Sequence, residues 1–320
     1  RHHFLRRPDM VTRISTAGNY GAVLADLMAA EARLVDAGNR ISTQKNGSDL
    51  KGYSQKAETL TAMQTVQARL KTYQAQNDQI AAKLANQDQA LTTVSNAGTA
   101  VRQAIADALA SDNAGTLMQI VQNQFQTAAQ AMNAQYNGKY LFGGGQIFTK
   151  PVSATQLSDL TTGPPISSFF QNDQYQTQAK LDDSTTVTTG VLASNLGTDM
   201  LTAFQSLEAF HQSGLGPFSG PLTNAQRTFL TTAVATWKGV AEAATQVAAQ
   251  NGLVQQRVDA VKVTVTAQDD TLTGMLGDIT DADMAKAATD LTTAQTAVQA
   301  TAQVIQALRS SSLLNLLPVG

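Results

Sequence analysis

The sequence predicts a mainly α-helical protein: a long coiled-coil-like helical bundle formed by the N- and C-terminal regions, with a small β-rich central insertion. Apolar residues recur at alternating steps of three and four over long stretches at both ends of the chain. Gly, Pro, Thr and Ser break this pattern in the middle. Aromatic residues make up only 5% of the 320 residues, so the core must consist mostly of Ala, Val and Leu.

Composition narrows the classes of function. Charged residues make up 14% of the chain, against roughly 25% in an average soluble domain. The resulting neutral polar surface repels its own copies weakly, which favours stacking of identical subunits. A formal net charge of −2 gives no reason to expect nucleic acid as a partner. The absence of Cys excludes disulfides and cysteine-based redox chemistry, and the sequence has no apolar run long enough to suggest a membrane span.

Residues 1–9 are basic and lack an apolar run, so we expect an extension or a cloning remnant there, with Met10 as the natural start. The sequence shows no cleavable signal peptide. If the protein leaves the cell, it therefore needs a route other than general secretion.

The N-terminal assembly segment, residues 10–50, contains a first expected helix that ends at a turn-rich break, Asn46–Asp49. Its apolar positions are Val23, Leu27, Ala30, Leu34, Ala37 and Ile41. A second helix is expected from about Tyr53 to Ala110, which is roughly 85 Å at 1.5 Å per residue. Asn77, Gln87 and Gly98 occupy core positions of this helix. Buried polar residues at such positions cost stability but can set the register between helices.

A third helix over residues 117–132 completes the first part of the bundle core, residues 51–136. The outer insertion, residues 137–223, is rich in Gly, Pro, Thr and Ser. β-branched and aromatic residues between turn signals predict short strands around Tyr140–Phe142, Phe169–Phe170, 175–178 and 185–189. A short helix at about Thr198–His211 and a Gly- and Pro-containing loop should follow.

The bundle core returns at residues 224–279, where a long helix is expected from Asn224 to an interruption at Gly277-Asp278. The C-terminal assembly segment, residues 280–320, should hold a last helix over Met284–Leu308 with Asp281 as its N-cap. Because neither end helix has another partner of sufficient length, we expect the two ends of the chain to pair with each other.

Residue clusters that could suggest chemistry have simpler explanations. His211 ends a helix, where its charge would complement the helix dipole. The glycines at 143–145 lack the Lys-Ser/Thr of a phosphate loop, so they predict a turn where two segments pass closely. Asp278, Asp281 and Asp283 lack the Gly and Glu of a calcium loop and suit helix capping instead. We therefore expect no catalytic, metal or cofactor site and no enzymatic activity.

The remaining candidates are the apolar stripes of the two end helices. These stripes are thin and rich in Ala, so an isolated pair would be marginal, and contacts with neighbouring copies would supply the missing burial. The long helices are expected to pack within one subunit, and an ordinary intramolecular hairpin remains the alternative for the ends. The predicted assembly residues are Ile14, Leu27, Leu34, Ile41, Leu291, Val298, Ile305 and Leu308.

Several segments resemble the flagellin superfamily. The start at Arg13–Thr16 and the end at Asp281–Ala285 and Ser312–Leu317 are similar to the family's termini. The run Gly138–Gly144 and the stretch Val187–Leu201 look like its hook-associated, hook–filament junction branch. The family's usual Asp-Asp-Ala-Ala-Gly run is replaced by Gly-Ser-Asp-Leu-Lys-Gly at 47–52, which favours the junction branch or a divergent one over filament flagellin.

The resemblance implies a structural, extracellular flagellar protein exported by the type III apparatus. Copies of the chain would form a ring at the hook–filament junction, on the first hook-associated protein, and would seat the first flagellins. A cytosolic export chaperone would hold its C-terminal helix beforehand.

Three other functions remain open. A filament flagellin, or a flagellin-like surface protein, would extend into long filaments by itself. A surface binding module would use Phe169, Phe170 and Tyr175 of the insertion as its stacking surface. An enzyme ranks last, because the sequence shows no nucleophile, base and orienting group together.

Overall fold

The computed structural model describes residues 9–47 and 50–314, which fold as two compact units. One unit consists of the described residues up to Gln67 and from Asp270 onward, and the other spans Ala68–Asp269. Within the described ranges, the elements are seven α-helices and two small two-stranded sheets. This confirms the expected mainly α-helical class with a small β element.

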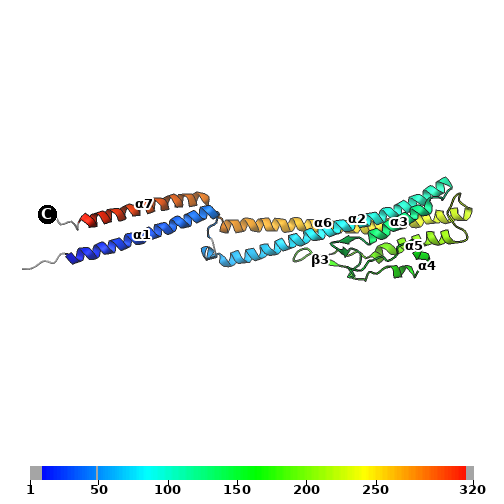
Figure 1. Ribbon diagram of the computed structural model, residues 1–320, viewed down its shortest axis with the longest axis horizontal. Helices are drawn as coiled ribbons and strands as arrows, with labels where there is room; N and C mark the ends of the chain where they lie inside the picture. The colour runs from blue at the N-terminus through cyan, green and yellow to red at the C-terminus, as the bar shows by residue number, and fades with distance from the viewer. Residues whose placement is uncertain (1–8, 48–49, 315–320) are drawn as a thin grey trace, which may run out of the picture. The chain divides into compact units, whose positions relative to one another are not determined.

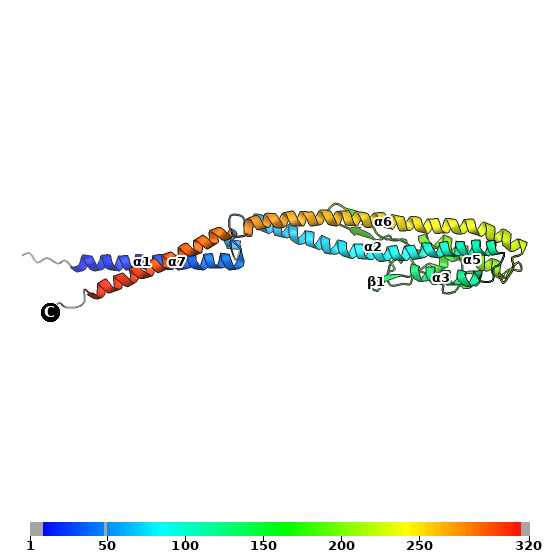
Figure 2. The same cartoon turned by 90° about the horizontal axis from the view of Figure 1, so that it is seen from above.

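The first unit is built on a pair of helices from opposite ends of the chain. Helices α1 (Asp9–Thr43) and α7 (Met284–Leu314) lie side by side and run antiparallel (Figures 1 and 2). The expected pairing of the two ends is therefore confirmed. Of the expected break after α1, Asn46 and Gly47 are non-helical, and residues 48–49 lie outside the described part. A short 3-10 helix, η1 (Leu50–Tyr53), then leads to α2.

Two long helices, α2 (Ala57–Ser111) and α6 (Asn224–Thr280), occur close to where the apolar spacing predicts them. The start of α6 is set by a reciprocal cap. The Gln226 amide nitrogen donates to Thr223 Oγ1 at 3.2 Å, and the Thr223 amide nitrogen donates to Gln226 Oε1 at 3.0 Å. The expected interruption at Gly277-Asp278 is wrong, because the Asp281 amide nitrogen donates to the Gly277 carbonyl at 2.7 Å and the helical ladder continues to Thr280.

The N-cap expected at Asp281 for the last helix is also wrong. Asp283 has that position, since its Oδ1 accepts a hydrogen bond from the Lys286 amide nitrogen at 3.0 Å, three residues further on. The Asp281 carboxylate instead accepts hydrogen bonds from Lys45 Nζ and Thr280 Oγ1. A contact with a residue distant in sequence has therefore displaced the local one.

The second unit contains the large core. Helices α3 (Leu117–Met132) and α5 (Ala193–Gln212) pack with this unit's portions of α2 and α6 around a fully buried aromatic cluster. The rings of Phe125 and Phe204 meet edge to face at 5.4 Å, and those of Phe204 and Trp237 at 4.7 Å. Short elements α4 (Asp159–Thr162) and η2 (Ile166–Phe169) cover this core.

The β structure of the insertion is limited to two antiparallel pairs. Strands β1 (Gln135–Tyr136) and β2 (Lys139–Tyr140) join through Asn137 and Gly138, both with positive φ, as an Asn-Gly hairpin turn requires. Strands β3 (Gln178–Lys180) and β4 (Thr186–Thr188) form the second pair. The strands expected at Tyr140–Phe142 and Phe169–Phe170 are mostly absent, because Leu141, Phe142 and Phe169 enter the apolar core from loops or the 3-10 helix.

Candidate assembly surface

The α1–α7 pair buries little apolar surface. Its fully buried side chains are Ala30 and Ala37 on α1 and Ala287 and Ala294 on α7. Their spacing of seven residues places each pair on one face of its helix. Because an alanine contributes only a methyl group, the described part of this pair has a thinner core than the second unit.

The predicted assembly residues lie on the faces that the buried alanines define. Their side chains are half-buried in the structure: Leu27, Leu34, Ile41, Leu291, Val298, Ile305 and Leu308. We call the α1 residues Leu27, Ala30, Leu34, Ala37 and Ile41 the inner row. Ile14 belongs to α1, but its side chain is outside the described part of the chain. The structure thus brings the predicted residues together within one chain, and their contacts with other copies stay a prediction.

The segment that follows α1 is hydrogen-bonded to the segment that precedes α7. The Ala282 amide nitrogen donates to the Gln44 carbonyl at 2.9 Å, and the Asn46 amide nitrogen to the Thr280 carbonyl at 2.8 Å. The hydrogen bond from Lys45 is the main cause that lowers the pKa of the Asp281 carboxyl below its usual value. These bonds hold the end of α1 beside the start of α7.

The sequence interpretation missed a second apolar row on α1, which we call the outer row. Its residues are Tyr20, Leu24, Met28 and Val35, with exposed fractions of 37%, 43%, 64% and 62%. Their spacing of four, four and seven residues places them along one side of a helix. This spacing is visible in the sequence, but it is less regular than the alternating steps of three and four in the inner row, which alone was used to predict the apolar side of α1.

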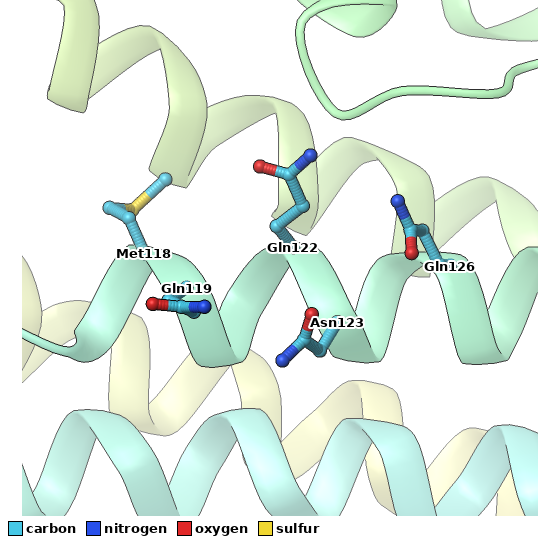
Figure 3. A pocket seen from close by; sticks show the side chains of 5 residues that line it. All are labelled: Met118, Gln119, Gln122, Asn123 and Gln126. Carbon is cyan, nitrogen blue, oxygen red and sulfur yellow. The ribbon is translucent and has the colours of Figure 1, made fainter.

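Two shallow pockets lie on helix faces. The pocket on α3 encloses about 490 Å³ and is lined by Met118, Gln119, Gln122, Asn123 and Gln126. Figure 3 shows the amide groups spread along the face of α3 instead of converging on one point. The pocket on α7 encloses about 400 Å³, and we call it the α7 groove. It is lined by Thr292, Thr293, Thr296, Ala297 and Ala300.

The chemistry of these surfaces suits packing more than catalysis. Neither lining contains a titratable side chain, so neither pocket offers a general acid or base. In the described part of the chain, acidic and His side chains do not gather in groups of three that could hold a metal ion. None of the helices within residues 9–47 and 50–314 combines the length and apolar character needed to cross a membrane.

The glycines at 143–145 form the close passage that the sequence predicts. Gly144 has a φ of +66°, and the Gly145 amide nitrogen donates to Asp173 Oδ1 at 2.9 Å. A Cβ on Gly145 would lie 2.6 Å from Asp173 Oδ2, too close for any other residue without a shift. Hydrogen bonds from the Gly145 and Tyr175 amides lower the pKa of Asp173. The loop therefore binds a carboxylate of the same chain.

The stacking residues considered for a binding module do not form one surface. Phe169 is buried in the core of the second unit, Phe170 is half-buried against that core, and Tyr175 is exposed. An aromatic platform for a sugar ring needs exposed faces, and only Tyr175 of these three has one.

Comparison with known proteins adds two findings. The model of the bacterial flagellin C-terminal helical region matches residues 237–317, which include most of α6 and all of the described α7. A search of curated proteins by sequence finds no match.

Solved structures share the fold. A Vibrio parahaemolyticus protein described as a flagellar hook-associated protein superposes with a TM-score of 0.55 at 12% identity, covering 69% of this chain and 96% of the other. Bacillus cereus FlgL superposes with a TM-score of 0.55 at 15% identity, covering 68% of this chain and 99% of the other. The C-terminal part of the chain thus matches the flagellin C-terminal helical region, on a fold shared with these flagellar proteins.

Proposed function

We propose that the chain is a structural subunit of the bacterial flagellum, a hook-associated protein at the hook–filament junction. In this role it is exported by the flagellar type III apparatus, forms a ring of its own copies on the first hook-associated protein, and seats the first flagellins. An export chaperone holds its C-terminal helix before export. The chain has no catalytic activity in this role.

One observation carries the proposal: the region that matches flagellin includes α7, and α7 packs on α1 from the opposite end of the chain. In such a pair, helices from the two ends of the chain form one element, and four alanines form the buried centre of its described part. Two helices with so small a core gain stability when further helices cover them. Copies of the same chain are the natural source of these helices in a ring.

The neutral surface supports the same role. Charged residues make up 14% of the chain, and the pocket faces of α3 and α7 present mainly amides, hydroxyls and methyl groups. Such faces lose little electrostatic energy when copies approach closely, whereas like charges in contact would repel. The fold shared with hook-associated proteins supports a flagellar role over a role in another helical assembly.

Deletion of the gene in its own bacterium tests the junction role. We expect cells that still build hooks and secrete flagellin into the medium but hold no filaments, because flagellin has no seat on the hook. A plasmid copy of the intact gene should restore filaments and swimming. Filaments of normal length on the deletion strain would overturn the junction role.

The purified chain separates the junction role from that of a filament flagellin. A junction protein should stop at small assemblies, whereas a flagellin should extend into long filaments when seeded. Electron microscopy of the concentrated chain with and without seeds gives the answer. Long filaments built from this chain alone would favour flagellin.

A further inference from the structure

The chain contains three Asn-Gly pairs, which lie in different surroundings: Asn46-Gly47, Asn137-Gly138 and Asn251-Gly252. This dipeptide is prone to spontaneous deamidation, because glycine has no side chain to shield its amide nitrogen from the neighbouring carboxamide. Whether a pair reacts in a folded protein depends on the freedom of two groups, the Asn side chain and the Gly amide. The three pairs can therefore be compared group by group.

The pair in α6 is held at both groups. Asn251 is only 3% exposed, and its Nδ2 donates to the Leu84 carbonyl at 3.1 Å. Its Oδ1 accepts a hydrogen bond from Gln87 Nε2 at 3.1 Å. Gly252 lies in the interior of the helix, where the hydrogen-bond ladder fixes the backbone dihedrals. The carboxamide therefore cannot turn towards the Gly252 nitrogen without breaking buried hydrogen bonds.

The pair after α1 is held as well, although Asn46 is exposed. The Asn46 Nδ2 donates to the Asp281 carbonyl at 2.7 Å, and the Gly47 amide nitrogen donates to Tyr53 Oη at 3.0 Å. The electrophilic carboxamide and the attacking nitrogen are thus bound to different partners. A reaction between them requires both hydrogen bonds to break first.

The pair in the β1–β2 turn differs from the other two. Asn137 and Gly138 are both exposed, and within the described residues no hydrogen bond holds the Asn137 side chain. Their φ angles of +50° and +74° place them at the two central positions of the hairpin turn. Strands β1 and β2 pair over only two residues each, so the turn can open locally at small cost.

We propose that Asn137 is the site at which the folded chain deamidates. The Gly138 amide nitrogen attacks Cγ of Asn137, so that an N–Cγ bond forms and the Cγ–Nδ2 bond breaks. Ammonia leaves with the proton of the Gly138 amide, and the product is a cyclic succinimide. Water then opens the ring at either carbonyl, which gives aspartate or isoaspartate. Water is the only co-reactant, so the reaction needs no enzyme, and the inference does not depend on the proposed function.

Isoaspartate would disrupt the hairpin more than aspartate. Its main chain runs through the former side chain and is one methylene longer, whereas this turn type requires two residues of standard length with positive φ. Aspartate keeps the standard main chain and tolerates positive φ, as asparagine does. Strand β2 leads directly to Leu141 and Phe142, which are buried in the core of the second unit. Formation of isoaspartate should therefore loosen the attachment of the insertion to that core.

Ageing of the full-length chain tests the site directly. The folded protein is incubated at mildly alkaline pH, where the Gly amide loses its proton more easily, and the peptides that contain each Asn-Gly pair are compared by mass spectrometry. We expect the peptide with Asn137 to be deamidated several-fold more than those with Asn46 and Asn251. In the urea-unfolded chain the three pairs should react at similar rates, because only the folded structure distinguishes them.

Two outcomes would overturn the proposal. Equal deamidation of the three pairs in the folded chain would mean that the hydrogen bonds of Asn46 and Asn251 give no protection. The same excess at Asn137 in the folded and in the unfolded chain would mean that neighbouring residues in the sequence select the site and that the structure does not.

Two substitutions test the consequence for the hairpin. Asn137→Gly keeps a residue suited to positive φ and removes the reactive carboxamide, so ageing should leave its melting temperature unchanged. The parent should melt several degrees lower after ageing than before. Asn137→Asp carries the charge of the deamidated residue without the longer main chain, so it should melt close to the fresh parent. An equal loss of melting temperature on ageing in the parent and in Asn137→Gly would contradict the effect assigned to this turn.

Discussion

Single residues determine how the loops of the insertion pack against each other, and the loop at 143–145 is the clearest case. Gly144 adopts a left-handed conformation beside the Asp173 carboxylate. Residues with a Cβ adopt this conformation only at a cost, and here the Cβ would also meet the carboxylate. The glycine run therefore serves packing within the chain.

Gly144→Ala should destabilise the second unit by about 1–3 kcal/mol, because the backbone becomes strained and Asp173 must move. The measurement is urea unfolding followed by Trp237 fluorescence, which reports the core of this unit. Gly239→Ala is the matched control, since Gly239 is in α6 with open space around its Cβ position. That change should stabilise the helix by roughly 0.5–1 kcal/mol. Equal effects of both substitutions would contradict this account.

Carboxylates in turns make stability sensitive to acid. Hydrogen bonds from the Gly145 and Tyr175 amides lower the pKa of Asp173, and the amides of Gln156 and Thr155 lower that of Asp159. A lowered folded-state pKa means that the stabilisation is present above the unfolded pKa and is lost as pH falls through the folded one. The melting temperature should therefore drop as pH decreases below about 4.

The substitution Asp173→Asn separates this effect from general acid unfolding. The variant should melt at a lower temperature than the parent at neutral pH, and the difference should shrink in acid, where the parent carboxyl becomes protonated. Thermal unfolding at several pH values is the measurement. A constant difference at every pH would show that the charge of Asp173 plays no part.

At the scale of elements, buried polar side chains join α2 to α6 within the second unit. Gln87 Nε2 donates to Asn251 Oδ1 at 3.1 Å, and Asn251 Nδ2 donates to the Leu84 carbonyl at 3.1 Å, all away from solvent. Asn77 Nδ2 donates to the Leu181 carbonyl at 3.0 Å, which joins α2 to the insertion. Each of these hydrogen bonds forms only when the two segments are aligned at one position, which is the physical reason to expect that polar core residues can set the register.

Asn251→Ala should cost about 1–3 kcal/mol of stability, because it leaves the buried Gln87 amide without its partner, although Gln255 Nε2 still donates to the Leu84 carbonyl. Replacing both Gln87 and Asn251 with Leu removes the unpaired groups and should recover much of this loss. The double variant should also show weaker register specificity, visible as broadened amide resonances along α2 and α6. Sharp resonances in the double variant would mean that apolar packing alone sets the register.

The end helices differ from the long ones in the amount that they bury. Leu84, Leu91 and Val94 of α2 are fully buried, whereas Leu34 and Leu291 of the α1–α7 pair are half-buried. Local opening is easier where fewer apolar contacts must break. Amide exchange of the soluble chain should therefore be much faster in α1 and α7 than in α2 between residues 84 and 105. Equal protection of both regions would contradict this difference.

At the scale of the whole molecule, one unit should carry assembly and the other should carry most of the stability. Leu91→Ala should cost about 2–5 kcal/mol, because it opens a cavity in a fully packed core. Leu34→Ala should cost less, roughly 1–2 kcal/mol, since its side chain is only half-buried. Assembly should fail in Leu34→Ala although the second unit stays folded, as measured by near-ultraviolet dichroism. Normal assembly of this variant would remove Leu34 from the set of assembly residues.

The sequence by itself determined the helices and the pairing of the chain ends. Apolar spacing marks which side of a helix is buried, and it places α2, α3, α6 and α7 close to their observed bounds and α1 close to its observed end. Motif-level resemblance also pointed to the flagellin superfamily, which the match over residues 237–317 supports. The helices are local features, because their periodicity depends on residues within a few turns of each other. The pairing of the ends followed because neither end helix had another partner of sufficient length.

Only the tertiary structure decided the features that depend on distant residues. Asp281 suits an N-cap by sequence, but Lys45, far away in the chain, binds it and Asp283 forms the cap instead. Leu141 and Phe142 have the composition of a strand, but the core of the second unit takes up their side chains. Helix periodicity shows that a side is apolar without showing what covers it, so the division of α1 into an inner and an outer row required the position of α7.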